Sequence, residues 1–247
     1  MRFFAAAAIL VAFLASLAPA RAVDLAGIEA ATYMLYADEK AICSSQVVHS
    51  DDDGTVLLTA NHCVDGPDTT TYSVRETVRD GRAVISYTVY NAKVTRVDKQ
   101  SDLAALTLLD TKARLPVTTI ASVDEADTAL FKGADVLAAG YPGTSNAKMA
   151  DLVFTDGLFT GVRESFVPSV KIDVYRTTAP VWYGKSGGAL YTRIDGDWKL
   201  VGVATQLDPE TPWETSLWIP VVAVHKALLG LWKNTLPDLS APGYTER

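Results

Sequence analysis

Three short segments of the sequence carry residue types that together could catalyse acyl transfer. His62 lies in the segment TANHC (59–63), Asp102 in SDLAAL (101–106) and Ser186 in GKSGGAL (184–190). A serine hydroxyl is a weak nucleophile until an imidazole accepts its proton, and a buried carboxylate orients that imidazole and stabilises the imidazolium. Glycines beside the serine permit a sharp turn whose N–H groups can face an oxyanion. The order of these residues therefore predicts a catalytic triad of His62, Asp102 and Ser186.

Other acids and histidines offer less convincing partners. Asp98 lies close to Asp102 in the sequence, but the apolar run Leu103–Leu109 favours Asp102, which would then sit at the edge of a buried strand. His49 precedes a run of three acids in a predicted turn, and we interpret it as a solvated loop residue. His225 falls in a predicted C-terminal helix, where a surface or packed residue is more common than a ligand.

Two other families of active site share part of the serine motif. GKSGG satisfies the G-x-S-x-G pattern of α/β-hydrolases, whose acid and histidine follow the serine. Asp208 or Glu214 with His225 would supply that order, but the sequence lacks the alternating strands and long helices of that fold. A phosphate-binding loop would need a glycine where Ala179 stands, so the Gly-Lys pair does not indicate one.

The elements that would position these residues are mostly strands. Short apolar or alternating runs separated by turn residues predict an antiparallel all-β sandwich or barrel. Asp195-Gly196-Asp197 predicts a hairpin between two of these runs. Helical periodicity is found near Leu25–Tyr36 and over 221–233, where Val221, Val224, Leu228 and Leu231 share a face. The strands are predicted at Val56–Thr59, Val84–Tyr90, Ala104–Leu109, Val136–Ala139, Val170–Tyr175, Ala189–Arg193 and Trp198–Ala204.

Composition excludes several classes of protein. The chain has 247 residues, of which 49% are hydrophobic and 21% charged, which is typical of a globular protein and not of a disordered or coiled-coil chain. A net charge of −7 without a basic run argues against nucleic-acid binding and against anionic membrane surfaces. Two cysteines are too few for a four-cysteine metal centre. We expect no metal and no cofactor.

The N-terminus resembles a targeting signal. Arg2 is followed by an uncharged run from Phe3 to Leu17, and Ala20-Arg21-Ala22 supplies small residues for signal peptidase. The run is short for a transmembrane anchor, which needs about 20 apolar residues. We therefore expect a signal peptide over residues 1–22, cleaved after Ala22 or, less favourably, after Ala20. The mature protein would be periplasmic or extracellular, without a membrane contact.

The three motifs resemble those of the chymotrypsin-like serine proteases. TANHC is similar to that family's Thr-Ala-Ala-His-Cys, DLAAL to Asp-Ile-Ala-Leu-Leu, and GKSGG to Gly-Asp-Ser-Gly-Gly. GLFTG (157–161), YRTTAP (175–180) and Gly140-Tyr141-Pro142 are similar to segments of bacterial periplasmic members. The resemblance implies two six-stranded antiparallel β-barrels over about 40–125 and 126–220, within a protease domain spanning 23–247. Many of those bacterial members carry an added PDZ domain, and we expect none here because the chain ends too soon for one.

The same resemblance implies a role for further residues. The N–H groups of Gly184 and Ser186 would form the oxyanion hole, and a Cys43–Cys63 disulfide would brace the histidine loop. Substrate would bind between two walls, formed by Thr205, Gln206 and Leu207 on one side and Val181, Trp182 and Tyr183 on the other. Trp213 is a further candidate at the border of the cleft.

Two departures from the family pattern affect regulation and specificity. Lys185 replaces an aspartate that pairs with a freed N-terminus in zymogen-activated members, so we expect no activation by that route. Pro180 stands where trypsin-like members carry an aspartate that receives Lys or Arg, which points to a small or apolar substrate side chain instead.

The leading hypothesis is a secreted serine endopeptidase that cleaves polypeptides through an acyl-enzyme. Two alternatives stay open: a non-catalytic or latent binding protein, in which Lys185 distorts the oxyanion loop, and an esterase that uses the same triad. The oligomeric state is not indicated by the sequence.

Overall fold

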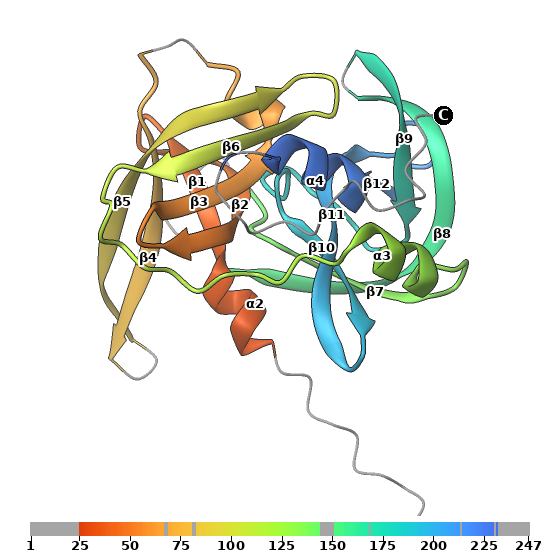
Figure 1. Ribbon diagram of the computed structural model, residues 1–247, viewed down its shortest axis with the longest axis horizontal. Coiled ribbons are helices and arrows are strands. Elements are labelled where there is room, and N and C mark those ends of the chain that lie inside the picture. Colours follow the sequence, from red (N-terminus) through yellow and green to blue (C-terminus); the bar gives the residue numbers. More distant parts are fainter. Residues whose placement is uncertain are drawn as a thin grey trace, which may run out of the picture.

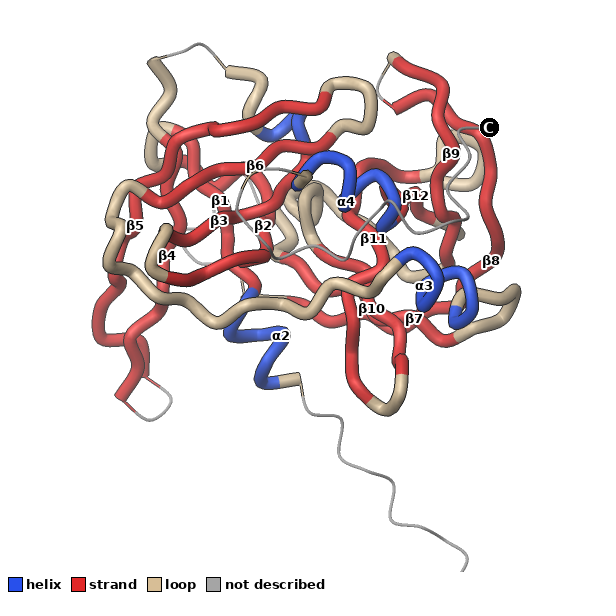
Figure 2. Tube along the Cα trace, viewed as in Figure 1, coloured by secondary structure: helices blue, strands red, loops and turns tan. Residues whose placement is uncertain are grey.

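The computed structural model describes residues 25–66, 69–80, 83–143, 151–167, 169–212, 214–229 and 231. The expected signal peptide (1–22) and Trp213 lie outside these residues. Most of the described chain is strand, with a few short helices (Figure 2). Within the described residues, twelve antiparallel strands form two sheets, and each sheet closes into a six-stranded barrel (Figure 1). The expected all-β fold of two antiparallel barrels is confirmed.

The first barrel contains the strands before residue 110, in the spatial order β1-β2-β3-β6-β5-β4. Its core is formed by apolar side chains such as Leu35, Val47, Leu57 and Leu106. The strands are β1 (Thr32–Ala37), β2 (Lys40–Asp51), β3 (Gly54–Ala60), β4 (Tyr72–Asp80), β5 (Ala83–Asp98) and β6 (Leu103–Leu108).

The second barrel has the spatial order β10-β11-β12-β9-β8-β7. Val136, Leu190, Val201 and Trp218 are among the side chains that fill its core. The strands are β7 (Asp135–Gly140), β8 (Val153–Val167), β9 (Val170–Thr177), β10 (Ala189–Ile194), β11 (Asp197–Leu207) and β12 (Ser216–Pro220).

Strands β3 and β6 are buried on both faces. Their packing holds in place the residues that flank them, among which are His62 after β3 and Asp102 before β6. Successive side chains of a strand point to opposite faces. Leu57 of β3 therefore points into its own barrel, whereas Leu58 joins a second apolar cluster with Leu200 and Val203 of the other barrel. The same alternation places Leu103 and Leu106 of β6 in different clusters. The two barrels are thus joined by an apolar interface through the strands that precede or follow the triad residues.

Helix α4 (Val221–Leu228) packs on β6 of the first barrel and on β11 and β12 of the second, and it lies between the two in Figure 1. The expected C-terminal helix is confirmed, but its predicted end at 233 is wrong. The backbone of Leu229, with ψ of 124°, is no longer helical, so the helix ends at Leu228. Leu231 still packs against the apolar cluster between the barrels.

The helix predicted near Leu25–Tyr36 is correct only in its first half. Helix α2 covers Ala26–Ala31, and β1 begins at Thr32. The residues from Thr32 onward are rich in β-branched and aromatic side chains, which favour a strand, and they pair with β2 and β4. A third helix, α3 (Val123–Ala129), begins with a capping box between Ser122 and Glu125 that the sequence analysis did not identify.

The interpretation of His49 as a solvated loop residue is wrong. His49 lies in β2, is 7% exposed, and its Nε2 is 2.9 Å from Asp51 Oδ1. The reason is that β2 extends to Asp51, so the predicted turn begins later than expected. His225 is buried in α4 and its Nε2 bonds the Ala121 carbonyl at 2.8 Å.

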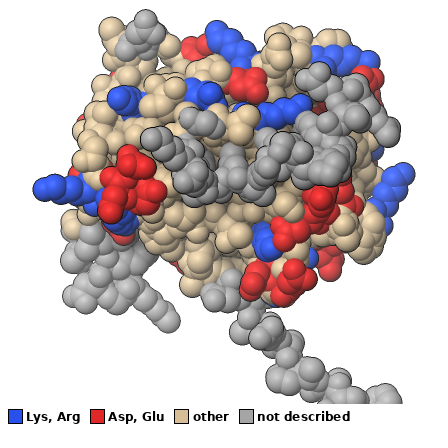
Figure 3. Space-filling view, in the orientation of Figure 1, with Lys and Arg blue, Asp and Glu red and all other residues tan. Residues whose placement is uncertain are grey.

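Among the described residues, no helix is long and apolar enough to cross a membrane. On the face shown in Figure 3, lysine and arginine side chains are scattered among acidic ones instead of gathering in one patch.

Candidate active site

The pairing of β3 with β6 brings His62 and Asp102 together. Ala60 at the end of β3 pairs with Leu103 at the start of β6, so the residues just beyond them are neighbours. His62 lies on a short 3-10 turn, η1 (Asn61–Cys63), and the Asn61 N–H donates to the Asp102 carbonyl at 2.9 Å. His62 and Asp102 are 40 residues apart in the sequence, and the hydrogen-bonded pair β3–β6 of the first barrel holds them side by side.

The Asp102 carboxylate is completely buried and accepts three hydrogen bonds. The His62 N–H donates to Oδ1 at 2.9 Å, and Oδ2 accepts from the His62 ring Nδ1 at 2.8 Å and from the Thr205 hydroxyl at 2.6 Å. Because Nδ1 faces the carboxylate, it carries the proton, and Nε2 is left as the basic nitrogen. Asp102 adopts a left-handed backbone (φ 51°), a conformation that non-glycine residues adopt at an energetic cost.

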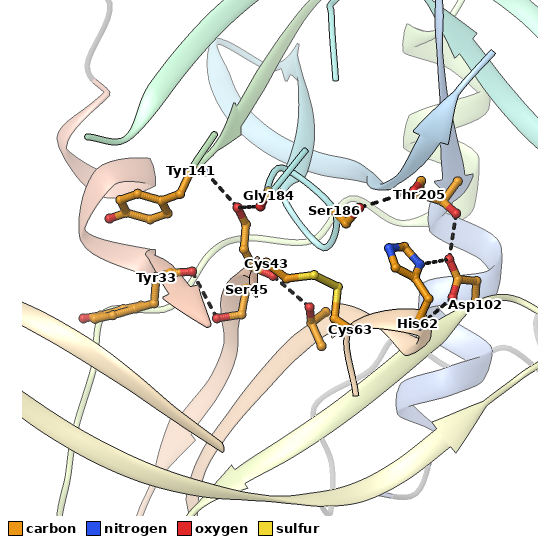
Figure 4. The surroundings of a disulfide bond; sticks show 12 residues. Tyr33, Cys43, Ser45, His62, Cys63, Asp102, Tyr141, Gly184, Ser186 and Thr205 are labelled. Carbon is orange, nitrogen blue, oxygen red and sulfur yellow. Dashed lines mark hydrogen bonds and ion pairs between the residues drawn. A yellow bond between two sulfur atoms is a disulfide. The ribbon is translucent and has the colours of Figure 1, made fainter. Parts of the chain in front are cut away.

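Ser186 comes from the second barrel and faces the His62 ring across the boundary between the barrels. Figure 4 shows the imidazole between Asp102 and Ser186. The Ser186 hydroxyl donates to the Thr205 carbonyl at 3.4 Å, a long bond that leaves the hydroxyl able to turn toward the imidazole. The His62 side chain is 38% exposed, so a substrate carbonyl can approach from solvent.

The backbone around Ser186, residues 182–186, forms a loop in which every carbonyl already accepts a hydrogen bond. We call this segment the oxyanion loop. Its carbonyls, in order from Trp182, accept from Lys185 N–H, Gly143 N–H, the Ser44 hydroxyl, Gly188 N–H and Ser44 N–H. By contrast, the N–H groups of Gly184 and Ser186 make no hydrogen bond with any other described residue. Backbone donors inside proteins are seldom unpaired, so these two are available to a ligand.

The direction of the Gly184 N–H follows from the bond at Tyr183. In a trans peptide the carbonyl and the next N–H point to opposite sides. Because the Gly143 N–H holds the Tyr183 carbonyl, the Gly184 N–H must point away from Gly143. Gly184 has φ of 86°, and a Cβ there would come within 2.1 Å of the Gly143 nitrogen, so only glycine fits.

The structure contains a disulfide between Cys43 and Cys63 with a Cα–Cα distance of 6.1 Å. It links β2 to the turn that carries His62, and both cysteines are buried in the core of the first barrel. His62 and the two sulfurs lie close enough together to suggest a metal site, with their ligand atoms within 4.8 Å of one another. Both sulfurs are consumed by the disulfide, however, and only the thiolate form of cysteine binds metals.

The residues expected to line the substrate walls occupy different environments. Val181 is 3% exposed, whereas Trp182 and Tyr183 are 49% and 88% exposed. On the opposite strand Thr205 is buried, and Gln206 and Leu207 are half-buried. Pro180, which directly precedes Val181 in the sequence, is half-buried.

Sequence reasoning missed a residue that joins the two walls, Ser216. Its hydroxyl accepts from the Val181 N–H at 2.8 Å, and Ser216 pairs with Leu207 in the sheet. Sequence reasoning also missed Ser44, whose hydroxyl donates to the Gly184 carbonyl and accepts from the Tyr141 N–H at 2.8 Å. No sequence signal identifies either residue, since serines are common on strands and their partners are distant in the chain.

Asp98 and Asp208, the alternative acids, have other partners. Asp98 accepts from the N–H groups of Gln100 and Ser101 in a turn. Asp208 is fully buried and forms ion pairs with Arg163 at 3.1 Å and Arg176 at 2.8 Å. Burial alone would raise the pKa of Asp208, but the Glu210 N–H, the Thr215 hydroxyl and the two arginines outweigh it and lower the pKa.

The chain resembles solved structures of bacterial proteases. The active form of the Rv3671c protease from M. tuberculosis has a TM-score of 0.62 at 21% identity, covering 86% of this chain and 85% of that one. The MamO protease domain from Magnetospirillum magneticum has a TM-score of 0.61 at 17% identity, covering 81% and 96%. The HtrA-type protease AlgW with decapeptide has a TM-score of 0.62 at 19% identity, covering 83% and 66%. At these identities the likeness establishes the fold alone.

A search of curated proteins finds no significant match to the sequence. The sequence model of the trypsin-like peptidase domain, however, matches residues 43–203, which is more than half of the chain and includes the three motifs. The chain therefore belongs to the trypsin-like peptidase family and is a serine-type peptidase.

Proposed function

We propose that the protein is an exported serine endopeptidase in which Ser186 is the nucleophile, His62 the general base and Asp102 the residue that orients His62. The observation that carries this proposal is the placement of the His62 imidazole. Its Nδ1 is 2.8 Å from the buried Asp102 carboxylate, and its ring lies toward Ser186 (Figure 4). A base held in one tautomer beside a serine is the arrangement that activates a hydroxyl nucleophile.

The reaction would proceed through an acyl-enzyme. Ser186 Oγ attacks the peptide carbonyl carbon while its proton passes to His62 Nε2, and the unpaired N–H groups of Gly184 and Ser186 donate hydrogen bonds to the oxyanion. The C–N bond then breaks, and His62 returns the proton to the leaving amine. Water repeats the same steps on the ester, which releases the acid and restores the Ser186 hydroxyl. The Asp102 carboxylate stabilises the imidazolium throughout.

A polypeptide is the substrate class that the resemblances favour, since the AlgW structures hold a tripeptide and a decapeptide. Pro180 carries no charge to attract Lys or Arg, and the Ser216 hydroxyl is already bonded to the Val181 N–H. These features support a small or apolar side chain before the cleaved bond. Export is expected to be accompanied by cleavage after Ala22 or, less favourably, after Ala20, and N-terminal sequencing of protein recovered outside the cytoplasm tests that step.

Turnover measurements with matched variants test the proposal. Ser186→Ala is expected to lower kcat/KM by about 10⁴-fold or more, with an unchanged circular dichroism spectrum. Ser169→Ala, at an exposed serine in the turn between β8 and β9, is expected to retain full activity. Parallel assays with peptides and the corresponding esters separate an endopeptidase from an esterase. Equal hydrolysis by wild type and Ser186→Ala would refute the proposal.

A further inference from the structure

Lys185, the residue before Ser186, is buried although it carries an ionisable amine. It is 1% exposed, and lysines are seldom buried to this degree without an acidic partner. Among the described residues, no carboxylate forms an ion pair with it. Its Nζ instead donates to the Thr155 hydroxyl at 3.0 Å and to the Pro180 carbonyl at 3.4 Å. Burial lowers the pKa of Lys185 to about 8.

The side chain connects the oxyanion loop to the interior of the second barrel. The backbone of Lys185 is part of that loop, because its N–H donates to Trp182 at 2.9 Å. Its Nζ reaches Thr155, which is fixed in β8 by pairing with Ala138 of β7. Between these two ends, the side chain passes Gly140, where a Cβ would lie only 3.3 Å from Lys185 Cγ.

Filling space would not by itself require an amine at this position. An apolar side chain of similar length would fill the same volume without the cost of burying a polar group. Hydrogen bonds, unlike apolar contacts, fix a direction. The 3.0 Å bond to the Thr155 hydroxyl, with the longer contact to the Pro180 carbonyl beside it, restricts how far the loop can shift or rotate. The amine can donate to both acceptors whether it is charged or neutral.

We propose that Lys185 is a positioning residue that holds the oxyanion loop from inside the second barrel, so that the N–H groups of Gly184 and Ser186 face the substrate. This role rests on the proposed function of those two groups. The anchor points are Thr155 on strand β8 and Pro180 in the connection between β9 and β10, and both belong to this chain. The loop is therefore formed by the chain itself, and Lys185 supports the active site instead of distorting it.

Lys185→Met tests the role because it keeps the length of the side chain and removes its donors. Loss of one well-placed oxyanion donor lowers kcat by about 10²- to 10³-fold, so partial misalignment of both is expected to lower it about 10- to 100-fold. KM is expected to change less than about threefold, since the walls of the cleft are unaltered. The melting temperature of Lys185→Met is expected to equal or exceed that of the wild type, a result that a purely structural role would not give.

Thr155→Val provides a second variant at the other end of the hydrogen bond. Thr155→Val is expected to lower kcat by a smaller factor than Lys185→Met does. The double variant is expected to be no slower than Lys185→Met, because the two substitutions remove the same hydrogen bond. Ser169→Ala serves as the control. A kcat within twofold of wild type in either single variant, or fully additive losses in the double variant, would overturn the role of Lys185. An inactive wild type would instead refute the proposed function.

Discussion

Replacing Cys43 and Cys63 together by alanine removes the covalent link between β2 and the turn that carries His62. The two cysteines are 20 residues apart in the sequence, and the disulfide closes a loop of that size in the unfolded chain. The loop-entropy relation gives about 11 cal/mol/K for such a loop, or about 3.3 kcal/mol at 25 °C. For a chain of this length the corresponding fall in melting temperature is about 7–13 °C.

Urea denaturation at pH 7 measures this change as a difference in the free energy of unfolding. The matched control is a dithiol reductant, which is expected to destabilise the wild type by a similar amount and to leave the cysteine-free variant unaffected. The reasoning would be refuted by a cysteine-free variant within about 1 kcal/mol of the oxidised wild type, because the loop-entropy estimate is about three times larger.

Two further predictions concern buried carboxylates. Asp102→Asn is expected to lower kcat/KM by about 10⁴-fold in an ester assay, because an amide favours the wrong tautomer of His62, and an unchanged rate would contradict the assigned role. Asp208→Asn is expected to destabilise the protein at pH 7 by about 2 kcal/mol, because Arg163 and Arg176 lose the charge of a buried partner, while Arg163 keeps its ion pair with Glu210. Since the folded pKa of Asp208 is lowered, its stabilising contribution is present above the unfolded pKa of about 3.9 and is lost as the pH falls through the folded value. The stability difference between wild type and Asp208→Asn is therefore expected to shrink below about pH 4, and a constant difference from pH 7 to 3 would refute this.

Much of the architecture could be predicted from local patterns. Strand β9 alternates between apolar and polar residues, β7 contains a continuous apolar run, and the turn at Asp195-Gly196-Asp197 has the residues that a hairpin needs. A short 3-10 turn directly after β3 carries His62, which lies in the motif TANHC. These features depend on residues that are close together in the sequence.

What could not be predicted depends on contacts between distant segments. Helical periodicity continues into β1 although its residues have strand propensity, and the pairing with β2 and β4 decides that the segment is a strand. The hydroxyl of Ser44 reaches Gly184, which is far along the chain, and no local pattern marks such a contact. For the same reason the sequence shows that Lys185 departs from the family motif but not where its side chain goes.

The most direct test of the central claim is the site at which a fluorophosphonate reacts with the purified protein. Such a probe forms a covalent bond only with a serine whose proton a neighbouring base accepts. The expected result is one added label per chain, located by peptide mass mapping on Ser186, and absent from Ser186→Ala but present in Ser169→Ala. A folded, disulfide-bonded wild type that stays unlabelled, or a label on another residue, would contradict the account.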